Sequence, residues 1–191
     1  MKHNQAAVIA AAATFLLGIA PATFAGQSAV EFRNTYGPLF QHPPVPPVWA
    51  RPKPPHGSST LEHVLYWNKI AVDASGLDHT PPAPGENRVW AEQYGPCRAS
   101  RAMAIVHIAM FDAFDAIAGG YESYTGIAPA RGRASIEAAI AQAAHDTLVA
   151  LFPAQAATMD GLLADDLDQM RITDKHAKTS GIAVGHRAAA A

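Results

Sequence analysis

Cysteine, aromatic residues and charged residues are all scarce in this sequence of 191 residues. Its one cysteine, Cys97, leaves no second thiol for an internal disulfide, and we expect it to be a small buried residue rather than a nucleophile. Charged residues make up 16% of the chain and the formal net charge is −2. A chain this close to neutral lacks the basic surface with which proteins bind nucleic acid, so no nucleic-acid partner is expected.

The sequence also lacks an apolar run long enough to span a bilayer. Residues 6–20 form the main apolar stretch, which falls short of the ~20 residues that a spanning helix needs. Lys2 precedes this stretch and the small residues at 23–25 follow it, so residues 1–25 have the anatomy of a secretory signal peptide. A cut after Ala22 is an alternative. We expect the mature protein to be periplasmic or secreted, with no stable membrane span.

Proline and alanine are what the sequence has in abundance. Eight prolines fall within residues 38–55, a density that no helix or central strand tolerates. Residues 26–60 are therefore predicted to form an extended, polyproline-like arm. The following residues, 61–191, repeat apolar side chains at helical spacing, which predicts an all-α fold with a bundle of about five helices.

The stretch from Gly95 to Gly120 is the most apolar of these predicted helices. It opens with a Gly-Pro turn and closes with paired glycines, which suit a helix terminus. One apolar line contains Ala102, Val106, Ala109 and Ala113, and a second line covers another face. A helix that is apolar nearly all round must be surrounded by others, so this one is predicted to be the central helix.

A helix before this stretch is predicted from a capping box formed by Ser59 and Glu62. It should end at Gly76. Asn68 lies within its apolar stripe, where a buried amide must be hydrogen-bonded, so we expect a bond to a neighbouring backbone. The residues predicted to face inward are Leu61, Val64, Leu65, Ala71 and Val72.

Two helices are predicted on the other side of the central stretch. Ser135 should cap the first, which Pro153 stops. Its inward stripe is Ile136, Ile140, Ala143, Thr147 and Leu151. The second should turn Met159, Leu162, Leu163, Leu167 and Met170 inward and leave Asp165, Asp166 and Asp168 facing water. These aspartates lack the spacing and the glycine of a calcium-binding loop.

A last helix is predicted from Asp174 onward. Gly181 and Gly185 stand one turn apart, which leaves room for close contact with a neighbouring helix. The helix reaches Ala191 with no terminating glycine, polar cap or turn at its end. The sequence therefore predicts a bundle that is incomplete at the C-terminus, with an open apolar face.

The most reactive combination of side chains is Ser100 and Arg101 followed by His107. Arginine presents a forked set of donors to an oxyanion, and histidine can attack phosphorus or hold a metal oxyanion. However, six residues correspond to about 600° of rotation along a helix, so Arg101 and His107 should point to different sides. The adjacent His145 and Asp146 are likewise not expected to face each other. The sequence has no metal-ligand spacing, phosphate-binding loop or nucleophile elbow, so no residue is assigned a catalytic role.

Several segments, taken together and in order, carry a resemblance to a known family. They are Trp67-Asn68, Gly95-Pro96, residues 100–113, Tyr121, Tyr124, residues 143–145, residues 151–153 and residues 181–185. They resemble the amino-terminal half of bacterial vanadium-dependent haloperoxidases, which belong to the PAP2 (type 2 phosphatidic acid phosphatase) superfamily. The resemblance covers residues 61–191. It implies a mostly helical fold and, in the complete family, a pocket for vanadate or phosphate.

The family's pocket residues lie in its carboxy-terminal half, and none of them is carried over here. Arg51-Pro52 lacks the lysine that precedes the family's Arg-Pro, and residues 55–58 have the letters of its Pro-Ser-Gly-His motif in the wrong order. Ser100, Arg101 and His107 match the spacing of its third motif, but the residues around them match its amino-terminal core helix. No cofactor is therefore expected to bind this chain alone.

Three interpretations remain open. The chain is a fragment of an exported haloperoxidase-like or phosphatase-like protein, separated from a C-terminal catalytic half that is its expected partner. Alternatively, it is a non-catalytic periplasmic module that binds a partner, or a second copy of itself, through its open helical face. The third interpretation is a small phosphatase that uses Ser100, Arg101 and His107.

Overall fold

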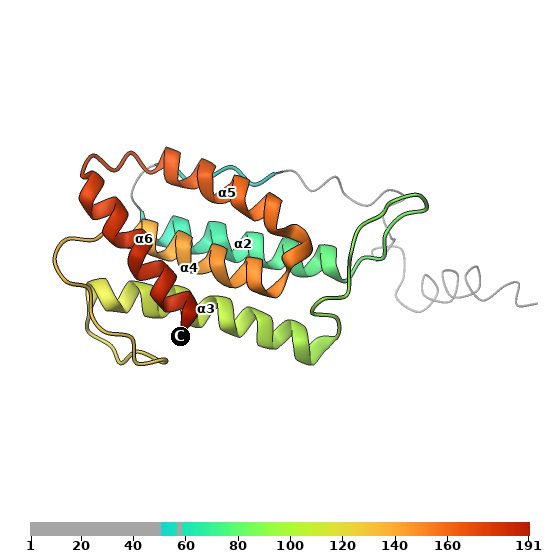
Figure 1. The fold of residues 1–191 in the computed structure, drawn as a ribbon, viewed down its shortest axis with the longest axis horizontal. Helices are drawn as coiled ribbons and strands as arrows, with labels where there is room; N and C mark the ends of the chain where they lie inside the picture. Colours follow the sequence, from blue (N-terminus) through green and yellow to red (C-terminus); the bar gives the residue numbers. More distant parts are fainter. Residues whose placement is uncertain (1–50, 57–58) are drawn as a thin grey trace, which may run out of the picture. The chain divides into compact units, whose positions relative to one another are not determined.

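The structure, a computed structural model, describes residues 51–56 and 59–191, and within them all of the regular secondary structure is helical (Figure 1). The predicted all-α bundle of five helices is confirmed. The helices are α2 (Thr60–Asp78), α3 (Pro96–Ala118), α4 (Ile136–Leu151), α5 (Ala156–Gln169) and α6 (Lys175–Ala190), with a 3₁₀ turn η2 (Pro153–Gln155) before α5. All of them belong to one compact unit, Trp49–Ala191. The predicted signal peptide and all of the predicted arm up to residue 50 lie outside the described residues.

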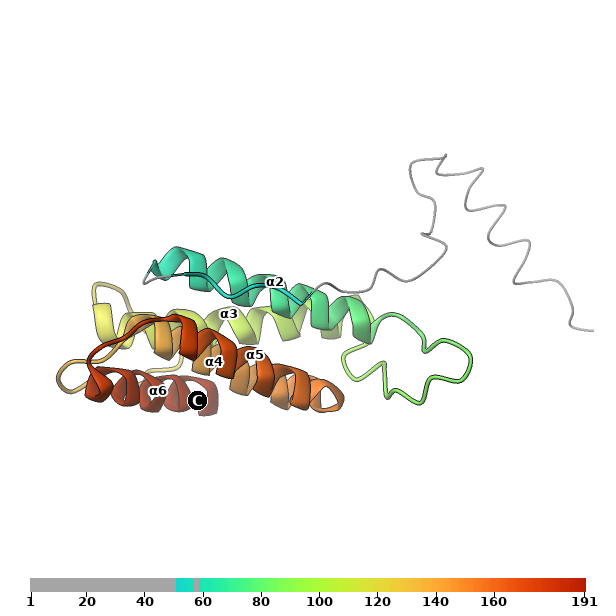
Figure 2. The same cartoon turned by 90° about the horizontal axis from the view of Figure 1, so that it is seen from above.

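The central helix is α4, not α3 as the sequence predicted. Helix α4 packs against α2, α3, α5 and α6 (Figures 1 and 2), and ten of its 16 residues are buried. Helix α3 buries eight of its 23 residues and leaves Arg98, Arg101 and His107 exposed. Small alanine side chains around α4 let four neighbours approach it closely, whereas the charged side chains of α3 keep one of its sides in water.

The helix boundaries follow the predicted capping residues with one exception. The side chain of Ser135 accepts a hydrogen bond from the amide of Ala138 at 3.2 Å, and Asp174 caps α6 through the amide of Ala177 at 3.0 Å. Ser59 occupies the N-cap position of α2, but its side chain caps none of the first amides, so the predicted capping box is wrong. Helix α2 also continues two residues beyond Gly76, to Asp78.

Helix α2 buries a different face from the one predicted, although Ala71 is buried and Val64 is partly buried against the core, as expected. Leu61, Leu65 and Val72 are 65%, 56% and 54% exposed. The buried face consists of His63, Tyr66, Trp67, Ile70, Ala71, Ala74 and Asp78. This orientation places the largest side chain of the helix, the indole of Trp67, fully in the core, and burial of that much apolar area outweighs the exposure of smaller side chains.

A buried carboxylate on α5 fixes this orientation. Trp67 donates its indole N–H to Asp166 at 2.8 Å, and the Nδ1 atom of His63 lies 3.0 Å from the same carboxylate. Asp166 is fully buried, so the prediction that it faces water is wrong, whereas its neighbours Asp165 and Asp168 are exposed as expected. The polar groups of Trp67 and His63 can be buried on this face of α2 because both lie within hydrogen-bonding distance of Asp166.

Helix α6 lies against α4 at the two glycines singled out in the sequence. A Cβ atom added to Gly185 would stand 2.5 Å from the carbonyl oxygen of Ala139, and one added to Gly181 would collide with the carbonyl oxygen of Ser135. Val184 and Ala188 of the same face join a cluster of small side chains with Ala109, Ala113, Ala116, Ala139 and Ala143. The predicted close contact is confirmed. The face that was expected to stay open is instead buried against α4 and α3.

Candidate functional site

The three residues of the phosphatase interpretation do not form a common centre. Ser100 donates its hydroxyl to the backbone oxygen of Cys97 at 3.2 Å, one turn back along α3. His107 donates from Nε2 to the side-chain oxygen of Asn68 on α2 at 3.0 Å. Arg101 is exposed and makes no ion pair with a described residue. Two further expectations are corrected here, because Cys97 is exposed and Asn68 bonds a side chain rather than a backbone group.

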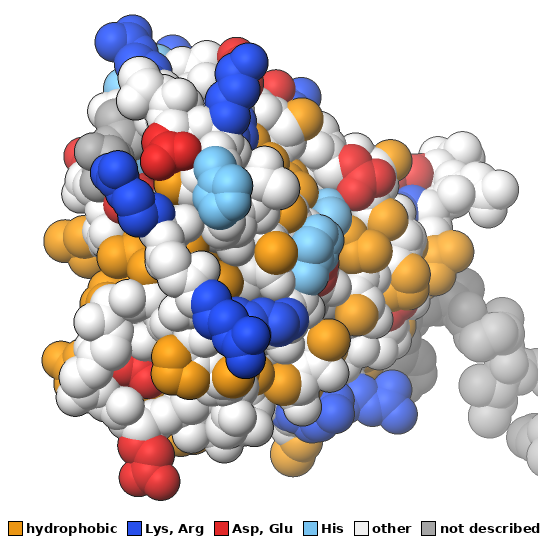
Figure 3. Space-filling model, turned by 60° about the vertical axis from the view of Figure 1, so that its left-hand side comes forward, with side chains coloured by type: hydrophobic (Ala, Val, Ile, Leu, Met, Phe, Trp, Pro, Cys, Tyr) orange, Lys and Arg blue, Asp and Glu red, His pale blue; other side chains and the backbone are white. Residues whose placement is uncertain are grey.

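The densest polar cluster lies where α4, α5 and α6 meet, and we call it the His145 network. The two ring nitrogens of His145 lie 2.8 Å from a carboxylate oxygen of Asp146 and 2.9 Å from one of Asp160. Asp146 also accepts from Gln142 at 2.7 Å and from Nδ1 of His186 at 2.5 Å. The prediction that His145 and Asp146 do not face each other is wrong, because Nδ1 of His145 is hydrogen-bonded to Oδ1 of Asp146. Figure 3 shows histidines among the lysines and arginines of one face of the molecule.

The geometry of this network sets the charge of its central ring. Both nitrogens of His145 face carboxylate oxygens, so both contacts are hydrogen bonds only when the ring carries two protons. Burial of the ring favours its neutral form, but the hydrogen bonds and negative charges of Asp146 and Asp160 outweigh burial and raise the pKa of His145 above its ordinary value. Burial opposes the ionised form of Asp146 too, yet the donors around it lower the pKa of this carboxyl.

Stability should therefore depend on pH through His145. Because the pKa of His145 is higher in the folded than in the unfolded state, protonation of this ring stabilises the fold. The stabilisation is complete below the unfolded pKa of about 6.5 and is lost as the pH rises through the folded pKa. We expect the urea midpoint to fall between pH 6 and pH 9 more steeply for the wild type than for His145→Gln. His107→Gln serves as the matched control and should keep the wild-type slope. Equal slopes for the wild type and His145→Gln would contradict the assigned imidazolium.

Tyr66 lies beside the buried Asp166 and has an unusual environment. Its hydroxyl is buried and has no hydrogen-bond partner among the described residues. Burial first, and then the negative charge of Asp166, raise the pKa of Tyr66 far above its ordinary value. This phenol therefore stays neutral.

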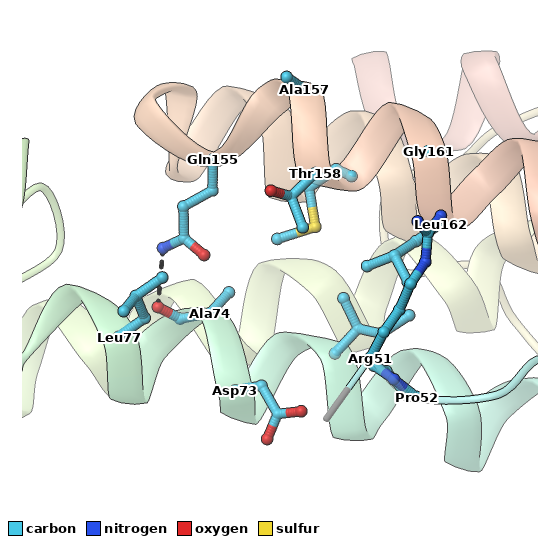
Figure 4. A pocket seen from close by; sticks show the side chains of 12 residues that line it. Arg51, Pro52, Asp73, Ala74, Leu77, Gln155, Ala157, Thr158, Gly161 and Leu162 are labelled. Atoms are coloured by element: carbon cyan, nitrogen blue, oxygen red, sulfur yellow. Dashed lines mark hydrogen bonds between the residues drawn. The ribbon is translucent and has the colours of Figure 1, made fainter. Parts of the chain in front are cut away.

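A cavity of about 430 Å³ lies between α2 and α5 (Figure 4). Its walls are apolar, and Arg51, Asp73, Gln155 and Thr158 line its polar part. Each ion in it already has a partner, because Arg51 pairs with Asp165 at 2.7 Å and Asp73 pairs with Lys69 at 2.6 Å. Gln155 donates to the backbone oxygen of Ala74 at 2.9 Å. The cavity has space for an apolar group, but no nucleophile and base converge in it.

Two aspartates of α3 organise the loop that follows this helix. Asp112 accepts from the amides of Tyr124 and Thr125 at 2.8 and 2.9 Å, and from the hydroxyl of Thr125 at 2.6 Å. Asp115 accepts from the amide of Tyr121 at 3.0 Å. Burial opposes ionisation, but these donors lower the pKa of Asp112 below its usual range. The sequence did not predict that Asp112 and Asp115 hold this loop, because a hydrogen bond to a backbone amide requires no particular side-chain pattern in the loop.

This loop presents an aromatic cluster to solvent. The rings of Tyr121 and Tyr124 both pack edge-on against Phe111, with ring centroids 5.8 and 5.6 Å away. Both tyrosines nevertheless remain largely exposed. The cluster is a rigid surface feature, because the hydrogen bonds to Asp112 and Asp115 hold the backbone beneath it.

Metal-ligating side chains and long apolar helices are the two remaining features that bear on a site in the described residues. In residues 51–56 and 59–191, no three His, Cys, Asp or Glu side chains are placed to hold a metal ion. No single helix in these ranges is long and apolar enough to cross a membrane, and α4 with residues 153–169 reaches the required length only as a pair bent by 119°.

Comparison with known proteins adds no further assignment. No family model matches the chain, and neither a curated protein nor a solved structure does so.

Proposed function

We propose that this chain is the helical, non-catalytic half of an exported vanadium-dependent haloperoxidase-like protein of the PAP2 superfamily. In this proposal a separate catalytic half supplies the vanadate pocket and oxidises halide with hydrogen peroxide. The helical half stabilises the catalytic half and covers one of its sides.

The observation that carries the proposal is the role of the residues through which the chain resembles this family. Trp67 joins α2 to α5 through Asp166, and Asp112 holds the loop that contains Tyr124. Gly181 and Gly185 bring α6 onto α4. All of these are structural roles, and this is what a scaffold half requires. Ser100, Arg101 and His107, by contrast, are directed to separate partners or to solvent.

The outer side of α3 and the aromatic cluster are the surface that we assign to the catalytic half. Phe111, Tyr121 and Tyr124 offer large rings with polar edges, which are enriched at protein interfaces. Because their backbone is held in place, little conformational entropy is lost when a partner covers them. A partner-binding module without any catalytic half is the alternative, and the same surface would serve it.

The chain alone should show no haloperoxidase activity. An oxyanion pocket needs several cationic and hydrogen-bond donors that converge in a preorganised site, and the described residues provide none. Residues 26–191, given vanadate, peroxide and bromide, should not brominate a diketone reporter above a control without protein. The ⁵¹V resonance of vanadate should stay that of the free ion.

Reconstitution tests the positive part of the proposal. A catalytic half of a bacterial haloperoxidase, expressed as a separate chain, should bind vanadate and brominate the reporter when residues 26–191 are added. Tyr121→Ala with Tyr124→Ala should weaken this reconstitution, whereas Val89→Ala, a matched exposed apolar position, should not. Failure to reconstitute would overturn the haloperoxidase proposal. Phosphatase turnover by residues 26–191 alone that disappears in His107→Ala would replace it with the small-phosphatase interpretation.

A further inference from the structure

Helix α2 presents to solvent an apolar seam that α3 reaches only at Asn68, through His107. The seam consists of Leu61, Leu65, Asn68 and Val72, whose spacing of four, three and four residues is that of a coiled-coil core. Its three apolar members are more than half exposed. Viewed from above, α2 lies along the edge of the bundle opposite α6 (Figure 2). The exposure of Leu61, Leu65 and Val72 leaves the seam accessible to another helix.

The charges beside the seam select one way of pairing two copies. In an antiparallel pair Leu61 faces Val72 of the second helix and Leu65 faces Asn68. Glu62 then comes beside Lys69 of the second copy, and the two-fold symmetry forms this opposite-charge pair twice. In a parallel pair, Glu62 of one copy and Lys69 of the other lie on opposite sides of the seam. Each then lies next to an apolar residue of the second copy, Val64 or Ala71, and no opposite charges meet.

Lys69 is able to take part in such a contact. It pairs with Asp73 of its own helix at 2.6 Å, but this pair is an exposed one, spaced four residues apart. Exposed pairs of this kind contribute little stability, so the ammonium group can be shared with a second carboxylate at low cost.

Asn68 marks the centre of the seam. Its side-chain oxygen accepts from His107 at 3.0 Å, which orients the amide and leaves its NH₂ group to donate elsewhere. In the antiparallel pair this amide lies opposite Leu65 of the second helix, so the orientation is selected by the charges of Glu62 and Lys69 and not by Asn68.

From these observations we infer that two copies of this chain associate through the α2 seam in an antiparallel arrangement. The dimer is independent of the proposed catalytic partner, which is assigned to α3 and the aromatic cluster.

Sedimentation equilibrium of residues 26–191 tests the association. The wild type should be a dimer, and Leu65→Glu should weaken association about tenfold or more because it places a charge in the seam. Val89→Glu, which changes an equally exposed apolar residue in the loop before α3, should leave it unchanged. A monomeric wild type, or equal effects of the two variants, would overturn the inference.

Engineered cysteines in a Cys97→Ser background test the orientation. Leu61→Cys and Val72→Cys should each fail to form disulfide-linked dimers alone, and should form the mixed dimer when combined under oxidising conditions. Glu62→Lys should weaken association, and Glu62→Lys with Lys69→Glu should restore it. Self-linked Leu61→Cys would indicate a parallel pair and contradict the antiparallel seam, as would the absence of any mixed dimer.

Discussion

Gly185→Ala is expected to destabilise the fold by more than about 3 kcal/mol, beyond the usual range for an added methyl group in a core. The new Cβ atom would lie 2.5 Å from the carbonyl oxygen of Ala139, 2.6 Å from Cβ of Gln142 and 2.9 Å from the amide nitrogen of Ala143. Two of these atoms are backbone atoms of the central helix. They cannot move unless α6 separates from α4, which would expose the small side chains packed between them.

Intrinsic helix propensity favours alanine over glycine and so opposes this loss of stability. The sign of the change in unfolding free energy therefore shows whether the close contact or the propensity dominates. Alanine is about 1 kcal/mol better than glycine within a helix, and a site without a close neighbour should gain from the substitution. Gly161 on α5 is the matched control, because an added Cβ there meets only the end of the flexible Arg51 side chain at 3.1 Å.

Urea denaturation of the three proteins decides the question. Gly161→Ala should leave the free energy of unfolding unchanged or raise it slightly, and Gly185→Ala should lower it steeply or fail to fold. A Gly185→Ala protein as stable as the wild type would mean that α6 does not lie on α4 at this distance.

Asp166→Ala should have the second large effect, a loss of about 3–5 kcal/mol of stability, as when one member of a buried polar pair is removed. The indole N–H of Trp67 would lose its acceptor inside the core, and His63 would lose the carboxylate 3.0 Å from its ring. The vacated volume between α2 and α5 would add the cost of a cavity.

The adjacent aspartate provides the control for this prediction. Asp165 pairs with Arg51 at 2.7 Å, but both side chains are at least half exposed, so Asp165→Ala should change stability by no more than about 1 kcal/mol. Thermal unfolding of both variants gives the comparison. Equal midpoints would contradict the assignment of Asp166 as the residue that orients α2.

Much of the candidate site was beyond prediction from the sequence. Ser100, Arg101 and His107 were recognised as a pattern, but their separate partners, the backbone of Cys97 and the side chain of Asn68, depend on the path of the chain. The His145 network lies on three helices and bonds residues as far apart in sequence as Asp146 and His186, which are 40 positions apart. Contacts between residues so far apart in the chain produce no local sequence pattern from which they could be predicted.

The sequence by itself determined the number of helices and most of their ends. Ser135 and Asp174 cap α4 and α6 as predicted, and α4 ends just before Pro153. The spacing of Gly181 and Gly185 predicted the close contact between α6 and its neighbour. These features are local, because a cap or a turn acts on amides within a few residues of it.

Only the tertiary structure decided which helix lies at the centre and which face of α2 points inward. By apolar spacing alone Leu61, Leu65 and Val72 were the better core face, yet the opposite face is buried. The difference comes from Asp166, about 100 residues away, which accepts a hydrogen bond from Trp67, lies beside His63 and allows Trp67 to be fully buried. Burial of a helix face is a property of the pair of elements that meet there, so a single helix does not encode it.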